Sequence, residues 1–328
     1  MKKPTEEFNS LFIQSFKPED FLSLSIKEEI KHHYTSPEAF LSIIQEKKIR
    51  FTDYRYMNDK SENVYVVKVL LDFLEKNKGK YPNAEEVVYE MLKENDLKSI
   101  QNLDICSIKY TQIPRFTYKP ARKFVFCMCD EQDSLHMWNY YVNNNSYRGM
   151  NIGIKVINFL NIFDSAETKL LDPIQIFYGS VLYNQNKQFK EIETLMKNTE
   201  KCIKSIHSNN NNNNQKYAIL RLREYIDTKG LFYKSVKFKD EKEYRIVIEI
   251  DEKILDANKI DGIEECYCVK NGIISPYLNV QLPNDAISSV CLSPMTEFQI
   301  SHDSIKRLLE HNEFINFSIC KSKIPIRY

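Results

Sequence analysis

Glycine is scarce in this sequence, with 7 residues in a chain of 328. Neither G-x-G-x-x-G nor G-x-x-x-x-G-K-[ST] occurs, and both motifs use glycine to bring the backbone close to a phosphate. The scarcity argues against glycine-rich phosphate loops. A nucleotide bound by this chain would have to be held by side chains and strand ends.

Net charge and long apolar runs are also lacking. The 46 Lys and Arg residues balance 45 Asp and Glu residues, whereas dedicated nucleic-acid binders and polybasic membrane proteins are usually more lopsided. No window approaches the roughly eighteen apolar residues of a membrane-spanning helix. The start, "MKKPTEEFNSLFIQSF", lacks the apolar run of a signal peptide. We therefore expect a cytoplasmic protein without membrane contact.

The eight cysteines include no C-x-x-C pair. Cys127 and Cys129, like Cys266 and Cys268, are spaced i, i+2 in strand-like runs, which places both thiols of a pair on one face. Structural zinc sites favour other spacings. Buried free thiols in a reducing compartment are therefore the expected state.

The order of apolar patterns predicts an α+β fold with a mixed, mostly antiparallel sheet core and helical insertions. Strands and helices are interspersed without a regular βαβ rhythm. We expect an N-terminal helical extension over residues 1–30 and a single α+β domain over residues 31–328. Helical insertions are expected at about 62–104 and 185–229 within that domain.

The segment "EKEYRIVIEI" from Glu241 is the clearest strand. Glu243 and Arg245 share one of its faces, and Glu241 joins them if the strand already begins there. A carboxylate pair beside a cation can polarise a hydroxyl or stabilise a cationic transition state. The alternative is a salt-bridged, solvent-facing edge of the sheet.

A short strand, "HHYT", precedes a helix start at "SPE", where Ser36 is in the N-cap position. His33 and Thr35 would share a face of that strand, and both can hydrogen-bond a ribose or an amide. Tyr34 can stack or pack inward. The alternative is a half-buried strand that leads into a capped helix.

Asn58, Asp59 and Glu62 follow the next short strand, "KIRF". Asn-Asp is turn chemistry, and Glu62 stands three residues after Asp59 as in a capping box. The alternative is a carboxylate site for a ribose or a cation, including a metal site of Asp59, Glu62 and Glu243.

The run "CSIKYTQIPRFTYKPARKF", Cys106 to Phe124, contains basic and aromatic residues and no acid. This mixture is typical of a loop that contacts phosphates and stacks bases. The alternative is an ordinary loop that balances acidic surface elsewhere. The candidate nucleic-acid-binding residues are Arg115, Lys119, Arg122 and Lys123.

Several segments, taken in order, resemble a bacterial family known only as a domain of unknown function, family 2971 (DUF2971). They are "HYTSPEAFLSIIQEKKIRFT" with "MND" and Glu62, "FCMC" with "DSLHMWNYY" and "GMNIGI", "DEKEYRIVI", and the tail "ISPYLNVQL … ISSVCLSP … ICKSKIPIRY". Together they span most of the chain from about Lys31 to Tyr328. The family name implies no reaction.

A second resemblance implies one. "HYT" before a helix is similar to the opening His-x-Thr of ADP-ribosyltransferases, and "EKE" occupies the place of their late Glu-x-Glu. By that resemblance His33 and Thr35 would hold NAD, Glu243 would be catalytic and Glu241 would address the acceptor. The further candidate contacts to NAD are Tyr34, Asn58 and Arg245.

Three hypotheses about function result. The first is an NAD-using ADP-ribosyltransferase-like enzyme or NAD hydrolase, acting as a toxin or an anti-phage effector. The second is a non-catalytic module that binds a nucleotide or nucleic acid, and the third is a metal-dependent hydrolase. The first requires His33, Thr35 and Glu243 to open into one cleft.

Overall fold

The structure, a computed structural model, describes residues 29–57, 64–93, 121–142, 148–164, 174–207, 219, 222–223, 225–256, 260–270 and 272–326. The chain divides into two compact units. The first comprises Met1–Leu24, Met57–Pro120 and Val181–Lys239, and the second comprises Ser25–Tyr56, Ala121–Ser180 and Asp240–Tyr328. The predicted site residues outside the described ranges are Asn58, Asp59, Glu62, Arg115 and Lys119.

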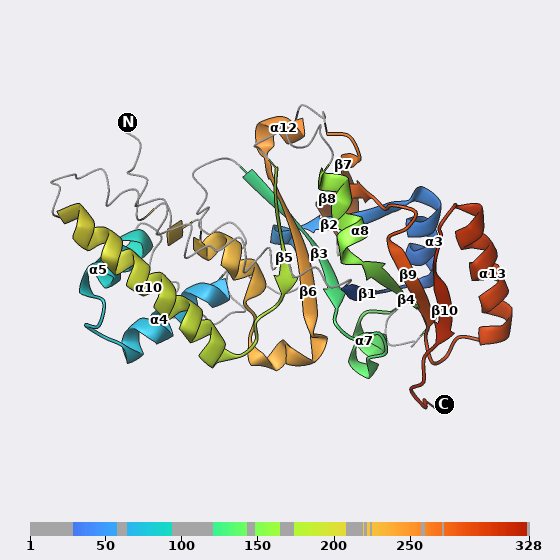
Figure 1. Ribbon diagram of the computed structural model, residues 1–328, viewed down its shortest axis with the longest axis horizontal. Coiled ribbons are helices and arrows are strands. Elements are labelled where there is room, and N and C mark those ends of the chain that lie inside the picture. The colour runs from blue at the N-terminus through green and yellow to red at the C-terminus, as the bar shows by residue number, and fades with distance from the viewer. Residues whose placement is uncertain are drawn as a thin grey trace. The chain divides into compact units, whose positions relative to one another are not determined.

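The described part of the first unit is mainly helical (Figure 1). Its longer helices are α4 (Val64–Lys76), α5 (Pro82–Lys93) and α10 (Gln185–His207). Apolar residues recur three and four positions apart on α4, which gives the helix one apolar face. That face packs with residues of α5 and α10 in a single buried cluster. These helices lie within the segments 62–104 and 185–229.

The second unit is built on one ten-stranded sheet. Its strands run in the order β10-β9-β4-β1-β3-β2-β8-β7, while β6 pairs with β3 and β5 pairs with β6. Only β9 and β10 are parallel among the pairs of this sheet that the structure describes. This arrangement confirms the predicted α+β class. The strands are β1 (Ile30–Thr35), β2 (Lys48–Asp53), β3 (Ala121–Cys129), β4 (Met150–Lys155), β5 (Ile174–Ser180), β6 (Glu243–Asp251), β7 (Ile263–Lys270), β8 (Ile273–Gln281), β9 (Ile287–Leu292) and β10 (Ser318–Lys321).

The sheet branches at β3. Along one side β3 pairs with β6 over its full length, from Ala121 opposite Asp251 to Cys129 opposite Glu243. Along the other side it pairs first with β2 and then, at Cys129, with β1. Strands β1 and β6 therefore flank β3 and do not pair with each other.

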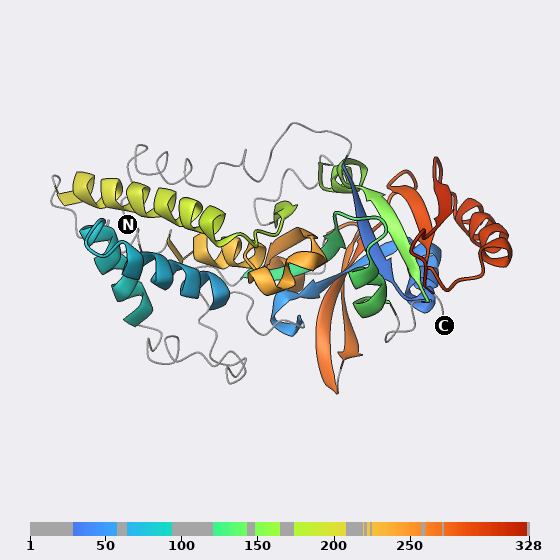
Figure 2. The same cartoon turned by 90° about the horizontal axis from the view of Figure 1, so that it is seen from below.

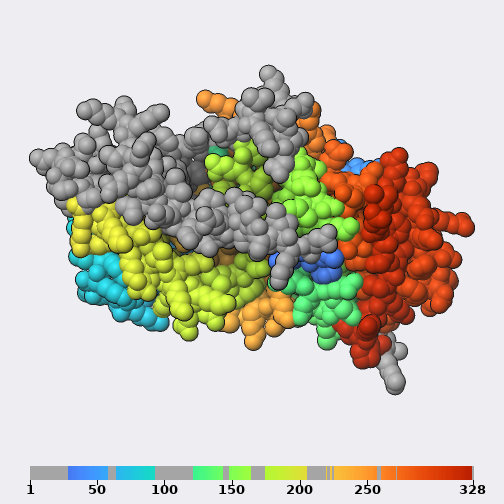
Figure 3. Space-filling model, viewed as in Figure 1, coloured from blue at the N-terminus to red at the C-terminus, as the bar shows by residue number. Residues whose placement is uncertain are grey.

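The two faces of this sheet differ in chemistry. On the apolar face, alternate residues of β3 and β6, such as Phe124, Phe126, Ile246 and Ile248, enter the main hydrophobic core. The other face, called here the polar face, carries the intervening residues. Helices that contribute side chains to the apolar core are α3 (Pro37–Glu46), α8 (Val156–Leu160), α12 (Glu252–Asp256) and α13 (Phe298–His311). Figure 3 shows the atoms of the C-terminal segment, in red, packed together in one continuous region.

Helix α3 begins as the sequence predicts. The backbone N–H of Ala39 donates to Ser36 Oγ over 3.2 Å, and Pro37 is the first helical residue. Lys47, with φ 50°, ends the helix in the left-handed conformation. The N-cap at Ser36 directly follows the end of β1, and the C-cap at Lys47 directly precedes the start of β2.

Two predicted boundaries are corrected. Strand β6 begins at Glu243, because Glu241 belongs to the 3₁₀ turn η6 (Val236–Glu241) and Lys242 has φ 42°. A left-handed residue cannot continue an extended strand, so Glu241 and Glu243 are not strand neighbours on one face. Helix α13 begins at Phe298, whereas the sequence pattern predicts a helix from about His302 to His311. None of the helices that the structure describes combines the length and apolarity needed to cross a membrane.

Candidate functional site

The residues predicted to hold NAD lie on opposite faces of the sheet. His32 lies opposite Cys129, and Cys129 lies opposite Glu243. Residues opposite each other on antiparallel strands point to the same face, and consecutive residues point to opposite faces. His32 therefore shares the polar face with Glu243, whereas His33 and Thr35 point to the apolar face. The expectation that His33, Thr35 and Glu243 open into one cleft is wrong, because strand alternation separates them.

His33 is half-buried and packs against the apolar core. Its ring centroid lies 4.8 Å from that of Phe126, and its Nδ1 lies 3.2 Å from the Cys127 carbonyl oxygen. Burial lowers the pKa of His33. The neutral ring with Nδ1–H donates to the Cys127 carbonyl oxygen, which gives the imidazole a polar partner. Thr35 is buried. Both residues match the alternative of a half-buried strand leading into a capped helix.

Tyr34 packs inward on the polar face beneath α7 (Leu135–Tyr140). Its hydroxyl donates to the Glu131 carbonyl oxygen over 2.8 Å and accepts from the Ser134 N–H over 2.9 Å. Its ring meets Trp138 edge-on at 4.7 Å between centroids. These contacts fasten the loop before α7 to β1, and they use both hydrogen-bonding roles of the hydroxyl.

Glu241, Glu243 and Arg245 are buried polar residues near the start of β6, and Tyr141, 43% exposed, contacts Glu241. Arg245 Nε and Nη2 donate to the two carboxylate oxygens of Glu243, each over 2.9 Å. Tyr141 donates to Glu241 Oε1 over 2.7 Å. Burial, followed by the charge of Glu241, raises the pKa of Tyr141. The bidentate bond occupies Glu243 with a guanidinium, as in the salt-bridge alternative, although the pair is buried and not solvent-facing.

The predicted metal set cannot be placed as a unit. Asp59 and Glu62 lie outside the described residues, and Glu243 is bound by Arg245. Within the described ranges, no group of three or more His, Cys, Asp or Glu side chains is arranged to hold a metal ion.

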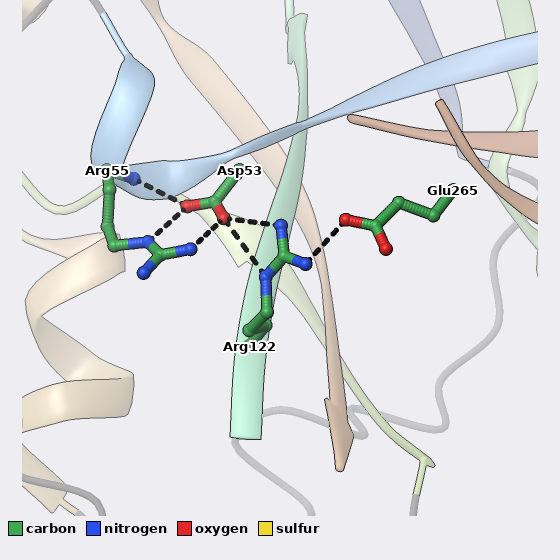
Figure 4. A network of polar contacts seen from close by, with 4 residues as sticks. All are labelled: Asp53, Arg55, Arg122 and Glu265. Atoms are coloured by element: carbon green, nitrogen blue, oxygen red, sulfur yellow. Dashed lines mark hydrogen bonds and ion pairs between the residues drawn. The ribbon is translucent and has the colours of Figure 1, made fainter. Parts of the chain in front are cut away.

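A different set of polar side chains converges at the margin of the sheet where β2 ends (Figure 4). Asp53 Oδ1 accepts from Arg55 Nε over 2.9 Å, and Asp53 Oδ2 accepts from Arg55 Nη2 over 2.6 Å. Arg122 Nη2 donates to Asp53 Oδ2 over 3.1 Å, and its Nη1 donates to Glu265. The network joins β2, β3 and β7.

The backbone explains why Asp53 holds both arginines. Strand β2 ends at Asp53, and the chain turns at once into η1 (Tyr54–Tyr56). In this turn the Arg55 N–H also donates to Asp53 Oδ1, over 3.0 Å. Asp53 itself is fully buried. A buried carboxylate with two cationic partners fixes both guanidinium groups in place.

These arginines line a cleft of about 300 Å³. Tyr267, on β7, stands in it with 63% of its surface exposed. The lining carries two guanidinium groups and three carboxylates, so its formal charge is negative. The lining residues are Arg55, Tyr56, Arg122, Glu252, Asp256, Glu265, Tyr267, Ile274 and Pro276.

The charges in the cleft are mutually stabilised. The hydrogen bonds from Arg55 to Asp53 raise the pKa of Arg55. Burial opposes the charge of Arg122, but the contacts with Glu265 and Asp53 outweigh it and raise its pKa. The charge of Glu265 raises the pKa of Tyr267, so the phenol stays protonated at neutral pH. Arg55 Nη1 makes no hydrogen bond in the structure as described and can donate to a ligand.

The cleft contains one of the predicted nucleic-acid contacts, Arg122. Lys123 points to the other face, where its Nζ lies 3.3 Å from Glu249 and its side chain is buried. The prediction for Lys123 is corrected, because consecutive residues of β3 alternate between faces. Arg115 and Lys119 lie outside the described residues.

Sequence reasoning missed most of this cleft. Arg122 is 69 residues from Asp53 and 143 residues from Glu265 along the chain. No local pattern connects such distant positions. The one available signal was Asp53-x-Arg55 at the end of a strand, a spacing that lets the arginine reach back to the carboxylate.

Comparison with known proteins identifies one family. A family model described as "Protein of unknown function (DUF2971)" matches residues 137–246, less than half of the chain. The matched segment contains Tyr141, Glu241, Glu243 and Arg245 but none of the cleft residues. No curated protein and no solved structure matches the chain. Over residues 137–246 the predicted resemblance to this family of unknown function is confirmed.

Proposed function

We propose that the cleft binds a nucleotide, either free or as one unit of a single-stranded nucleic acid. The observation that carries the proposal is the convergence of Tyr56, Tyr267 and Arg122 with three carboxylates in one cleft. Of the hypotheses drawn from the sequence, this corresponds to the nucleotide-binding module. Its contacts come from the sheet margin as well as from the basic aromatic run.

Stacking would provide most of the affinity. An exposed tyrosine offers a π-face to any base, and such stacking contributes about 1–3 kcal/mol per base. Tyr267 is largely exposed on β7, and because a tyrosine side chain has only two rotatable angles, the conformational entropy lost on binding would be small. Tyr56 lines the same cleft, and the Arg55 guanidinium lies 6.0 Å from its ring centroid.

The carboxylates favour bases that carry an amino group. Asp and Glu side chains accept hydrogen bonds from exocyclic amines such as N4 of cytosine. Glu252 and Asp256 line the cleft from α12 and are available for this role. Adenine, cytosine and guanine have an exocyclic amine, whereas uracil and thymine do not. We therefore expect weaker binding of uracil and thymine nucleotides.

Size and charge favour a single nucleotide over NAD. About 300 Å³ is at the lower end of the range for ligand pockets. The negative lining does not attract several phosphates, so one phosphate near Arg55 is the expected anionic contact. NAD chemistry on the ADP-ribosyltransferase pattern would also need His33 and Glu243 together, and they lie on different faces.

The test is a binding assay with short labelled oligonucleotides of adenine, cytosine or uracil, followed by competition with AMP, CMP, UMP and NAD. The Tyr267→Ala variant is expected to bind adenine and cytosine oligonucleotides roughly 5- to 150-fold more weakly, which corresponds to the loss of one stacked base. Fluorescence anisotropy gives the dissociation constants.

Tyr140→Ala is the matched control. Tyr140 is 66% exposed and lies on α7, beyond the opposite end of β3 from Arg122. Its replacement is expected to leave binding unchanged. The proposal is wrong if the wild-type chain binds none of these ligands, or if Tyr267→Ala binds as tightly as wild type. Conversion of NAD by the wild type, lost in Glu243→Gln, would instead favour the enzymatic hypothesis.

A further inference from the structure

We propose that β7 pairs with β7 of a second copy of this chain, in antiparallel orientation about a twofold axis at Tyr267. The two sheets would then join into one continuous sheet. This pairing does not depend on nucleotide binding. Only its consequence for the cleft, the approach of two nucleotide sites, rests on the proposed function.

Strand β7 is an edge strand whose exposed side chains are Tyr267 and Val269 together with the charged Glu264 and Lys270. It ends the strand order and, in the structure as described, pairs only with β8. Figure 2 shows this hairpin projecting from the sheet. Edge strands usually carry charges, prolines or bulges that prevent pairing, and β7 carries three charges, Glu264, Glu265 and Lys270, which limit how it can pair. On β7 the exposed fractions are 63% for Tyr267 and 77% for Val269, and on the neighbouring strand β8 they are 57% for Ile273 and 67% for Ile274.

Geometry limits the registers in which β7 can pair with itself. A continuous antiparallel sheet places side chains of the same face opposite each other. The register must therefore be centred on a single residue of β7, which faces its own copy across the twofold axis. A register centred between two neighbouring residues would place side chains of opposite faces against each other. The registers that keep most of the strand paired are centred on Cys266, Tyr267 or Cys268.

Charge selects among these registers. Centred on Tyr267, the pairing places Glu264 opposite Lys270 of the second copy, and the symmetry repeats this contact. Both side chains are exposed at the strand surface. Centred on Cys266 or Cys268, neither Glu264 nor Lys270 meets an opposite charge. Opposite charges at directly facing positions stabilise a strand pair, so the Tyr267 register is favoured.

The same register brings two clefts together. Tyr267 of each copy would face the other across the axis on the same side of the sheet, with Cβ atoms about 4.5–5.5 Å apart. Each tyrosine also lines its own cleft. If the clefts bind nucleotides, the dimer would present two adjacent stacking sites.

The first test is sedimentation velocity of the full chain without nucleotide. The wild type is expected to be a dimer that dissociates on dilution. Lys270→Glu sets two carboxylates against each other at both symmetry-related contacts, and it is expected to weaken association at least about tenfold, because facing like charges repel. The double variant Lys270→Glu with Glu264→Lys restores opposite charges and is expected to restore the dimer.

A wild-type chain that stays monomeric at high concentration would overturn the proposal. So would a dimer that Lys270→Glu leaves unchanged, or one that the double variant fails to restore relative to Lys270→Glu. Glu264 also accepts from Lys48 over 2.8 Å, which is why the comparison is made with Lys270→Glu and not with Glu264→Lys alone.

The second test is disulfide trapping, which reports the register itself. In this register Cys266 of one copy faces Cys268 of the other, at a separation that a disulfide can bridge. Diamide would oxidise the two thiols, taking two electrons and two protons as the S–S bond forms. We expect crosslinking in the wild type and in a mixture of Cys266→Ser with Cys268→Ser.

Either single variant alone is expected to crosslink no more than the double variant Cys266→Ser with Cys268→Ser, since like cysteines are two positions out of register. Crosslinking of one single variant alone above that background would indicate a different register and contradict the proposal. Because neither test contains nucleotide, a failure here leaves the proposed function of the cleft to its own assay.

Discussion

A neutral imidazole packed beneath a sheet is sensitive to protons only when the chain unfolds. The His33 ring packs against Phe126 of the apolar core, and its Nδ1 bonds to the Cys127 carbonyl oxygen. Burial lowers the pKa of His33, and it also lowers the pKa of the neighbouring His32. Protonating His33 in place would put a charge among apolar side chains, which is costly.

We therefore predict that acid destabilises the second unit through His33. Below the unfolded pKa of about 6.5, the unfolded chain takes up a proton that the folded chain does not, so the free energy of unfolding falls as pH falls. Above that pH the contribution is constant. Each such proton changes the slope by up to about 1.4 kcal/mol per pH unit.

The measurement is urea unfolding between about pH 7.5 and about pH 5.5, the range around the histidine pKa. Fluorescence of Trp138, the single tryptophan, reports on the second unit because the residue is buried there. His33→Gln is expected to have a shallower pH slope than wild type, with His32 leaving a residual slope. Equal slopes in the two proteins would show that His33 does not titrate on unfolding.

The start of α3 is a second place where one side chain sets a boundary. Ser36 Oγ satisfies the Ala39 N–H, one of the donors that a helix end leaves without an intrahelical partner. We predict that Ser36→Ala lowers the free energy of unfolding by about 1 kcal/mol. Ser42→Ala, on the same helix, removes only a surface bond to Glu46 and should cost less than about 0.5 kcal/mol. Equal losses in the two variants, again read from Trp138, would contradict the capping role.

Local patterns of this kind account for the part of the fold that the sequence predicted. Alternation along β6 predicts that Tyr244, Ile246, Ile248 and Ile250 share one face, and all four lie in the core, because period-two alternation needs no knowledge of a partner strand. The helix start at Ser36 was equally local. The start of β6 was misplaced because the left-handed Lys242 has no sequence signal.

The features that the sequence did not predict depend on which strands pair with each other. Strand β3 separates β1 from β6, and Cys129 lies opposite both His32 and Glu243. This arrangement results from pairing between segments that are far apart in the sequence. The same pairing decides which of His32 and His33 shares a face with Glu243. The cleft likewise depends on Asp53, Arg122 and Glu265 meeting from three strands. One unaligned sequence contains no direct record of such contacts.

The charge of the whole chain helps to distinguish nucleic-acid binding through phosphate contacts from binding through base stacking. The net charge is +1, and the cleft lining is negative. Binding that relies on phosphates releases counterions and weakens steeply with salt, whereas stacking does not. A chain that binds through Tyr267 and few cations should therefore depend only weakly on salt.

We predict a slope of about −1.4 to −2.1 in a plot of log affinity against log salt concentration for a single-stranded oligonucleotide, equivalent to two or three phosphate contacts at about −0.7 each. Replacing Arg115 and Lys119 by alanine is expected to reduce that slope by up to about 1.4, if both residues contact phosphates. Tyr267→Ala should lower affinity at every salt concentration and leave the slope unchanged, because it removes stacking and no charge. A wild-type slope of about −5 or steeper would show instead that phosphate contacts dominate, and the cleft would then not be the main binding surface.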